Sequence, residues 1–243
     1  MVATVSDTPV RHRWPTSIRR AIKLQERLRD RLRLTGGPRR VTVVAGADIS
    51  YDLHAGRLYA AVLNYSFPDL RRLEIALVRA PIGFPYVPGL LSFREAPALV
   101  QAFSRLNIRP DLLICDGQGI AHPRGMGLAS HLGLLLDLPT IGCAKSRLIG
   151  THRPPADRRG AIAPLYHGRR RIGTVLRSRR GVRPLYVSPG HRIGVAAATR
   201  YVLACCIGYR LPEPVRQADL TVGAARRGLP PQPGSSAGWP PPL

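Results

Sequence analysis

The sequence predicts an α/β protein built on one mixed sheet with helices on its faces. Three strand-like runs near the start of the chain are separated by short turns, a spacing typical of an antiparallel meander. Strand-like and helix-like runs then alternate, which favours parallel strands joined by helices. With 243 residues, 44% of them hydrophobic, the chain is long enough for one domain with a substantial core.

The first half begins with a polar segment, residues 1–14, that we expect to be flexible. A basic amphipathic helix follows over residues 17–34, where apolar residues recur among arginines at helical spacing and Gly36-Gly37-Pro38 ends the pattern. The meander strands are expected at residues 41–51, 57–65 and 73–80, and a Pro/Gly-rich loop then leads to a helix over 95–106.

The second half alternates between short apolar runs and helical patterns. Strands are expected at residues 112–115, 140–144, 161–166, 171–177 and 184–188, and helices at 128–136, 193–207 and 213–227. Residues 228–243 are rich in Pro and Gly and predict a disordered tail. We therefore expect a single domain over residues 15–227.

The charge is strongly one-sided, with 37 Lys and Arg against 14 Asp and Glu and a net charge of +23. Such a chain favours a polyanionic partner, most simply nucleic acid; the alternative is an Arg-rich surface that is merely solvated. No apolar run approaches the ~20 residues of a membrane span, and the N-terminus lacks the order of a secretory signal. We expect a cytoplasmic protein with no membrane partner. Its four cysteines form no C-x-x-C pair, so they are expected to be small core residues.

Two carboxylates stand inside apolar runs. Asp48 interrupts the run over residues 41–47, and Asp116 closes the run over 112–115. A buried carboxylate must be hydrogen-bonded, paired or bound to a metal. If the two strands are neighbours, the two groups repel each other, and Mg²⁺ would neutralise both. Either Asp alone would more simply be a cap or turn residue; the pair, with Glu95 at the start of a helix between them, favours a metal site.

Two other patterns are weaker. Gly117-Gln118-Gly119 follows a strand as a dinucleotide-binding loop would, but His122 stands where the third glycine belongs, and Asp116 would repel pyrophosphate. The histidines are not spaced for zinc on one helix face. His122 and His191 are instead expected to contact phosphate or water.

Six blocks of sequence carry a specific resemblance. They are GADISY at 46–51, PYVPGLLSFRE at 85–95, DGQGIAHPR at 116–124, IGCAKS at 141–146, VSPGHR at 187–192 and YRLPEP at 209–214. In order and spacing, from about residue 17 to 227, these blocks closely resemble the endonuclease V family of deoxyinosine-directed repair nucleases.

The resemblance implies a ribonuclease-H-like fold and an acidic metal-binding set. That set is Asp48, Glu95, Asp116 and, on the last helix, Asp219, where the family often has His. The implied chemistry is in-line hydrolysis of a phosphodiester assisted by Mg²⁺, for which Mn²⁺ can substitute. Lys145 would lie beside the scissile phosphate. Independently of the resemblance, 35 of the 37 basic residues are Arg. Lys145 is therefore either required as a compact ammonium group or a lysine that is present by chance.

The resemblance also implies how the base is reached. Pro85, Tyr86, Val87 and Pro88 would form a stiff wedge between base steps, with Val87 where the family usually has Ile; taken alone, such a loop is more often a turn. The extruded base would enter a pocket near Gly89, Leu91, Gly119, Gly127 and Leu148.

The function implied is that of a monomeric, Mg²⁺-dependent repair endonuclease for deaminated adenine (inosine, hypoxanthine) in DNA. It would nick the second phosphodiester 3′ to the lesion and leave 3′-hydroxyl and 5′-phosphate ends. Three alternatives stay open: a related nuclease that prefers inosine-containing RNA, the nuclease half of an excision-repair incision protein, and a non-catalytic nucleic-acid-binding domain. Single-stranded DNA or RNA also remains a possible partner, because the choice depends on a few 2′-hydroxyl contacts.

Overall fold

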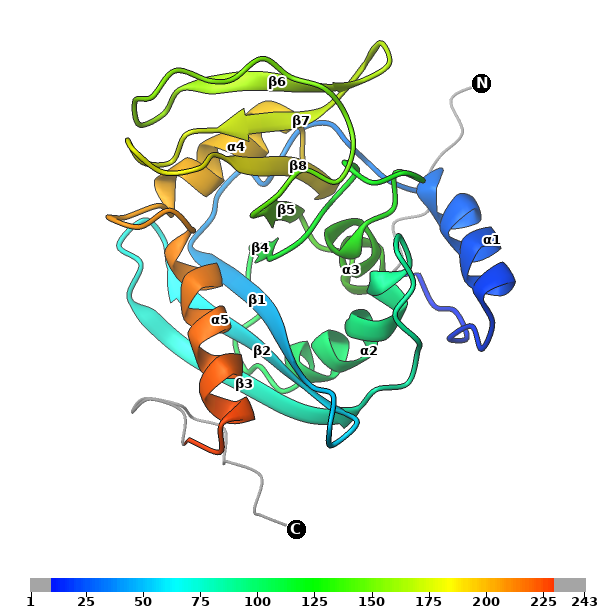
Figure 1. Cartoon of the computed structure of the whole chain (residues 1–243). Coiled ribbons are helices and arrows are strands. Elements are labelled where there is room, and N and C mark those ends of the chain that lie inside the picture. Colours follow the sequence, from blue (N-terminus) through cyan, green and yellow to red (C-terminus); the bar gives the residue numbers. More distant parts are fainter. Residues whose placement is uncertain (1–9, 230–243) are drawn as a thin grey trace.

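The computed structural model describes residues 10–229, and residues 1–9 and 230–243 lie outside the described part. The described chain forms an eight-stranded sheet in the order β3-β2-β1-β4-β5-β8-β7-β6 with helices on both faces (Figure 1). The strands are β1 (Val43–Asp52), β2 (Arg57–Ser66), β3 (Arg72–Pro81), β4 (Leu112–Cys115), β5 (Thr140–Ala144), β6 (Ile162–His167), β7 (Arg170–Leu176) and β8 (Leu185–His191). The helices are α1 (Ile18–Arg29), α2 (Leu91–Phe103), α3 (Leu128–Leu136), α4 (Val195–Ala204) and α5 (Glu213–Arg226).

The strand pairing confirms the predicted mixed sheet. β1, β2 and β3 form the antiparallel meander, and β1 then pairs in parallel with β4, which pairs in parallel with β5. The remaining strands add an arrangement that the sequence did not specify: β8 pairs antiparallel with β5, and β7 and β6 continue from it as a second antiparallel meander.

The two faces of the sheet have separate cores. Alternate residues of a strand face opposite sides, so Val44 packs in the core beneath α4 and α5 while its neighbour Ala45 packs in the core beneath α2 and α3. Figure 1 shows α5 lying across β1 and β2. The four cysteines are all buried in these cores and unpaired, as expected for small core residues.

Several boundaries differ from those predicted, and two of them bear on the site. α1 ends at Arg29 rather than near residue 34. α2 begins at Leu91, so Glu95 lies inside the helix rather than at its start. Leu90 precedes this helix without any side-chain cap, which removes the usual sequence signal for a helix start. Where a flexible N-terminal segment was expected, residues 10–14 pack on α3: the Val10 amide donates to the Leu134 carbonyl at 2.9 Å.

Of the expected C-terminal tail, residues 230–243 lie outside the described residues. Within residues 10–229, no helix has the length and apolar character needed to cross a membrane.

Candidate active site

The sheet brings Asp48 and Asp116 to the same place. β1 and β4 run in parallel with Ala47 beside Cys115. The residue that follows each of these two positions is one of the two aspartates. The Asp116 amide donates to the Ala47 carbonyl at 3.0 Å and holds this end of the pair together. Side chains alternate between the two faces of a strand, so the Asp48 side chain lies on the same face of the sheet as that of Val44. This is the face beneath α5.

Glu95 approaches from the helix on the other face of the sheet. It is a buried residue of α2, and its Oε1 accepts a hydrogen bond of 2.8 Å from the Tyr51 hydroxyl. The Arg94 guanidinium lies over the Tyr51 ring, 4.7 Å from its centroid. Burial raises the pKa of Glu95 to about 7, although the Tyr51 hydrogen bond acts in the opposite direction.

Lys145 completes the cluster from the loop that follows β5. Its Nζ lies 2.6 Å from Asp116 Oδ2 and 3.6 Å from Asp219 Oδ2. Burial alone would lower the pKa of Lys145, but the hydrogen bond and attraction from Asp116 outweigh it, so the pKa is raised. The lysine is therefore a fixed positive charge.

The position of Asp219 depends on close packing of α5. A Cβ on Gly46 would stand 2.2 Å from the carbonyl carbon of Pro214, so only glycine lets the start of α5 lie this close to β1. Asp219 then lies one and a half turns into the helix and faces Lys145 with a half-exposed side chain. Three strands, β1, β4 and β5, and two helices, α2 and α5, thus supply the charged groups.

The carboxylates are crowded enough to disturb their own ionisation. Burial, followed by repulsion from Asp116, raises the pKa of Asp48 to about 8. Burial also raises the pKa of Asp116, although Lys145 acts in the opposite direction. Each of these groups needs a proton or a cation to offset its neighbours.

The chemistry of this donor set fits a hard divalent cation. Carboxylate oxygens are the ligands that Mg²⁺ prefers, and a cation between them would relieve the repulsion that raises these pKa values. As the side chains stand, no three His, Cys, Asp or Glu residues within 10–229 are close enough together to form a ready-made metal site. Asp48, Glu95 and Asp116 are the residues that would hold the ion, with Asp219 as the expected fourth member. Lys145 is the cation that contacts both Asp116 and Asp219 in this conformation.

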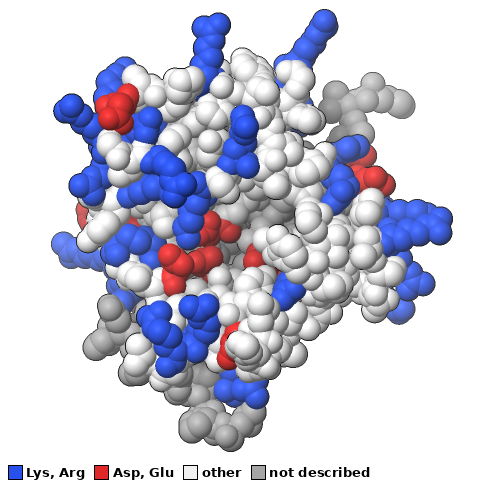
Figure 2. Space-filling model, viewed as in Figure 1, with Lys and Arg blue, Asp and Glu red and all other residues white. Residues whose placement is uncertain are grey.

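A cavity of about 420 Å³ opens beside the cluster. Figure 2 shows several Asp and Glu side chains gathered at the central hollow of this face, with Lys and Arg side chains around it. The cavity reaches the charged cluster at Glu95, Asp116 and Lys145. Of the residues predicted to handle the base, it is lined by Tyr86, Val87, Pro88, Gly89, Leu91, His122, Gly127 and Leu148. Pro85, Gly119 and His191 are not among the lining residues.

The loop before α2 presents Tyr86 outward, with 70% of the residue exposed. The loop turns at Gly89, whose φ of +77° is a left-handed conformation that glycine adopts without strain. The Gly89 carbonyl accepts hydrogen bonds from Gln25 Nε2 at 3.0 Å and from an Arg124 amino group at 2.7 Å. The tip is therefore exposed while its base is fixed to the body of the protein.

His122 supports this loop instead of offering a polar atom to phosphate. Its Nε2 lies 3.0 Å from the Gly89 carbonyl oxygen, and its Nδ1 lies 3.2 Å from the Arg124 amide, which donates to it. This pairing requires the neutral ring with its proton on Nε2. Burial, together with the charge of Arg124, lowers the pKa of His122 to about 4.

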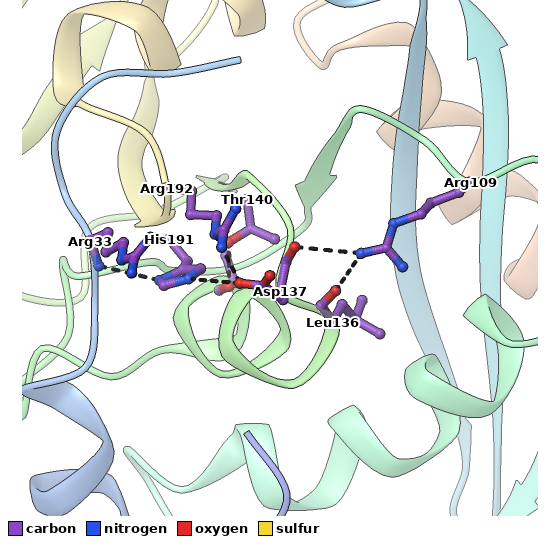
Figure 3. Close-up of polar contacts among 8 residues, drawn as sticks. Arg33, Arg109, Leu136, Asp137, Thr140, His191 and Arg192 are labelled. Atoms are coloured by element: carbon purple, nitrogen blue, oxygen red, sulfur yellow. Dashed lines mark hydrogen bonds and ion pairs between the residues drawn. The ribbon is translucent and has the colours of Figure 1, made fainter. Parts of the chain in front are cut away.

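His191 lies in a different polar cluster, at the end of α3 (Figure 3). Its Nδ1 accepts from the Arg33 amide at 3.2 Å, and its Nε2 faces Asp137 Oδ1 at 3.7 Å. Arg192 Nε lies 2.8 Å from the same carboxylate oxygen, and an Arg109 amino group donates to the Leu136 carbonyl at 2.7 Å. His191 is buried here, with its pKa lowered to about 4 chiefly by burial, and both of its ring nitrogens face protein atoms.

Gly119 and Gly127 are both required by close packing. A Cβ on Gly119 would stand 2.0 Å from the Pro189 carbonyl oxygen, and the Gly119 amide donates to Ser188 Oγ at 2.9 Å. Gly119 thus joins the loop after β4 to β8, behind the cavity. A Cβ on Gly127 would stand 2.3 Å from the Gln118 carbonyl oxygen, and this glycine does line the cavity.

Two residues of the site carry no role in the sequence prediction. Tyr51 bonds Glu95, and Arg210 holds the loop of Lys145. The Arg210 guanidinium donates to the carbonyls of Lys145 at 2.6 Å, Pro184 at 2.9 Å and Arg183 at 2.8 Å. Both residues fall within the six sequence blocks, but their partners come from distant parts of the chain, and no local pattern indicates them.

Comparison with known proteins gives a consistent result. The sequence profile of the family described as Endonuclease V matches residues 25–220. Endonuclease V of Alkalilimnicola ehrlichii is 53% identical over 215 residues, which are 88% of this chain and 94% of that protein.

Solved structures agree with the sequence comparison. The crystal structure of endonuclease V from Streptomyces avermitilis matches with a TM-score of 0.85 and 39% identity, over 91% of this chain and 99% of that one. Endonuclease V of Ciona intestinalis, solved with a 24mer DNA containing an inosine followed by a ribo-adenosine, matches in fold with a TM-score of 0.76 and 24% identity, over 87% and 98% of the two chains. The fold is ribonuclease-H-like, as the resemblance implied, and the chain belongs to the endonuclease V family.

Proposed function

We propose that the chain is a Mg²⁺-dependent DNA repair endonuclease that recognises a deaminated adenine. It hydrolyses the second phosphodiester 3′ to that base. The observation that carries the proposal is that Asp48 and Asp116 follow paired residues of neighbouring strands, while Glu95, Asp116 and Lys145 line a cavity bordered by the exposed Tyr86 loop. Membership of the family, one of whose proteins has been solved with inosine-containing DNA, supports the choice of substrate.

The acidic cluster supports the hydrolytic half of the proposal. When bound there, a divalent cation would supply Lewis-acid stabilisation of the charge that builds up on the attacking and leaving oxygens. Asp48, Glu95 and Asp116 would hold and orient it, and Tyr51 keeps Glu95 in place through its 2.8 Å hydrogen bond. A water oxygen attacks phosphorus in line, and the P–O3′ bond breaks. The products are a 3′-hydroxyl and a 5′-phosphate.

Lys145 supplies a positive charge that does not depend on the cation. Its Nζ contacts Asp116 at 2.6 Å, and Arg210 fixes its backbone through the Lys145 carbonyl at 2.6 Å. An ammonium held next to the acids can pair with a phosphate oxygen once those acids are neutralised. Such an ammonium would stabilise the transition state by electrostatics.

The Tyr86 loop and the cavity support the recognition half. Tyr86 is exposed at the tip of a loop whose base is fixed at Gly89, the arrangement needed for a ring that enters the space left by a displaced base. The cavity next to it has glycines at positions 89, 117 and 127, where ligand groups can approach the backbone. Hypoxanthine presents a carbonyl oxygen and a ring N–H where adenine presents an amino group and a bare nitrogen. Backbone groups can separate the two, because the wrong base leaves buried polar groups unpaired.

A nicking assay tests the proposal. Inosine-containing duplex should be nicked in Mg²⁺ and not in EDTA, and an otherwise identical adenine duplex should not be cut. Asp48→Ala and Asp116→Asn should abolish nicking and leave binding intact or tighter, because removing a carboxylate lowers repulsion toward phosphate. Retained nicking by either folded variant would contradict the metal-ligand roles. An inosine RNA of the same sequence, run in parallel, would show whether the 2′-hydroxyl is tolerated.

A further inference from the structure

A second cavity, of about 450 Å³, lies outside the candidate active site, between α1 and the segment before it. Four cationic side chains, those of Arg13, Arg20, Lys23 and Arg27, line it together with Trp14. None of the described residues that line it is acidic. In Figure 2 a group of Lys and Arg side chains projects at the right of the molecule, where Figure 1 places α1. Lys23 is also the one lysine of the chain besides Lys145.

These cations are spaced so that they repel one another, and the nearest acids, Glu26 and Asp30, do not line the cavity. Lys23 and Arg27 are four residues apart and Arg20 and Lys23 three apart, so both are like-charged neighbours on one face of α1. Like charges at these spacings repel each other on a helix surface. The first turn of α1 contains no acid to offset the positive end of the helix. A bound anion would relieve both sources of repulsion.

α1 also joins this cavity to the candidate active site. Gln25 lies on the opposite, buried side of the helix, where its Nε2 donates to the carbonyls of Gly89 at 3.0 Å and Met126 at 3.1 Å. Arg124 Nε donates to Gln25 Oε1 at 2.6 Å. These hydrogen bonds hold α1 in place between the base of the Tyr86 loop on one side and the cationic cavity on the other.

Trp14 adds an aromatic surface to the cations. Its ring stands edge-on to His12 at 4.8 Å between centroids and tilted to His131 at 5.6 Å, and His12 Nε2 lies 2.8 Å from His131 Nε2. The residue nevertheless remains 39% exposed and lines the cavity. A positioned ring beside a row of cations is what proteins use to bind single strands, stacking a base on the ring and pairing phosphates with the charges.

We propose that this cavity is a second nucleic-acid site, which holds a single-stranded segment of the substrate beyond the part that enters the active site. Phosphates contact Arg20, Lys23 and Arg27, and one base stacks on Trp14. The proposal rests on the chain acting on nucleic acid, as proposed above, but not on which bond it cuts. An acidic peptide could pair with the cations, but it would bring no base to stack on the Trp14 ring.

The first test reads Trp14 directly in the full-length protein. Trp14 and Trp239 are the two tryptophans of the chain, so Trp239→Phe leaves Trp14 as the single indole. An inosine-free oligothymidine should quench its fluorescence, and polyphosphate at equal charge should not, because only the oligonucleotide brings bases. An unchanged signal with oligothymidine, or equal quenching by polyphosphate, would overturn the proposal. No nicking is involved, so this result stands apart from the outcome of the inosine assay.

The second test uses a matched pair of variants on one helix. Lys23→Ala and Arg19→Ala each remove one exposed charge from α1, but only Lys23 lines the cavity. Binding is measured with the uncleaving Asp116→Asn chain on two inosine strands: a short one, and one extended by about ten nucleotides on each side, in the range of single-strand site sizes. Lys23→Ala should weaken binding of the extended strand about fivefold and leave the short strand unchanged, and its log–log salt slope should fall by about 0.7. Equal losses in Lys23→Ala and Arg19→Ala would show general charge attraction and contradict the site.

A third pair separates stacking from folding. Trp14→Leu should weaken the extended strand about fivefold or more, as expected for loss of one stacked base. Trp14→Phe should restore most of that loss, because it keeps a ring. If both variants melt at the parental temperature and bind the extended strand as the parent does, the indole does not stack on a base.

Discussion

Lys145 Nζ lies 2.6 Å from Asp116 Oδ2, the shortest link in a cluster that otherwise consists of mutually repelling carboxylates. Asp48 and Asp116 both have raised pKa values through burial, and Lys145 acts against that effect on each. The lysine therefore has two consequences at once. It keeps the acids more ionised than burial alone would, and in the proposed function it supplies a positive charge to the scissile phosphate.

Replacing Lys145 should separate these two consequences. Lys145→Met removes the charge, so nicking at pH 7 should fall by about a hundredfold, the usual cost of losing one electrostatic contact in a transition state. The pKa values of Asp48 and Asp116 should rise further, which moves the acidic limb of the pH–rate profile to higher pH. Lys145→Arg retains the charge and should keep that limb in place. An acidic limb that does not move in Lys145→Met would show that the lysine does not control the ionisation of the acids.

Tyr51 should affect the same profile through Glu95. The Tyr51 hydrogen bond lowers the pKa of Glu95, which burial sets at about 7. Tyr51→Phe should therefore raise that pKa, so that nicking falls about tenfold at pH 7 and recovers substantially at pH 9. Tyr59→Phe, which removes a hydroxyl from the neighbouring strand β2, is the control and should leave the profile unchanged. An equal loss at both pH values would indicate a structural role for the Tyr51 hydroxyl.

The raised pKa of Asp48 predicts how stability depends on pH in the metal-free protein. With a pKa of about 8 in the folded state and near 4 when unfolded, the group favours folding below pH 4 and loses that contribution as pH rises toward 8. Asp48→Asn removes the titration, so in EDTA its Tm should exceed that of the parent by about 3 °C or more at pH 8 and by little at pH 4.5.

Asp111 provides a control of opposite sign. Its partial burial would raise its pKa, but hydrogen bonds from the amides of Thr42 and Val43 and the Thr42 hydroxyl lower it overall. Its contribution to stability is therefore present above its unfolded pKa and lost at lower pH. Asp111→Asn should lower Tm at pH 8. A lower Tm for Asp48→Asn at pH 8 would contradict the assignment of strain to the acidic cluster.

Tyr86 should matter more for the lesion than for plain DNA. Its ring is exposed, and in the proposed function it fills the space left by an extruded base, a stacking contribution of about 1–3 kcal/mol. Tyr86→Ala should weaken binding of inosine duplex by that amount and of undamaged duplex by much less, while Tyr86→Phe should behave as the parent. Equal losses on the two duplexes would make Tyr86 a general contact.

The sequence was most informative where local pattern and fold coincide. Asp48 and Asp116 interrupt or end apolar strands, so the sequence predicts that they meet if the two strands are neighbours, and the parallel pairing of β1 with β4 meets that condition. The limits of α3 and of strands β4 and β5 were also predicted as they occur, because short apolar runs flanked by polar and glycine residues define them.

The remaining features depend on tertiary contacts that no local pattern contains. His122 and His191 are polar residues next to glycine and arginine, which suggests phosphate, yet their ring nitrogens are taken up by Gly89, Arg33 and Asp137. Position 119 requires glycine because the carbonyl oxygen of Pro189, 70 residues later, leaves no room for a Cβ atom. Tyr51 donates a hydrogen bond to Glu95, which is 44 residues away in the sequence. Arg210 donates one to the Lys145 carbonyl, which is 65 residues away.

The position of the cut tests the central proposal most directly. Because the Tyr86 loop and the acidic cluster belong to different elements, the bond that is broken need not adjoin the recognised base. A 5′-labelled duplex with a single deoxyinosine, incubated with the protein and Mg²⁺ and resolved on a sequencing gel, should give one product that ends in a 3′-hydroxyl at the second phosphodiester 3′ to the lesion. Free hypoxanthine, a cut at the lesion itself, or equal cutting of the adenine control would contradict the account.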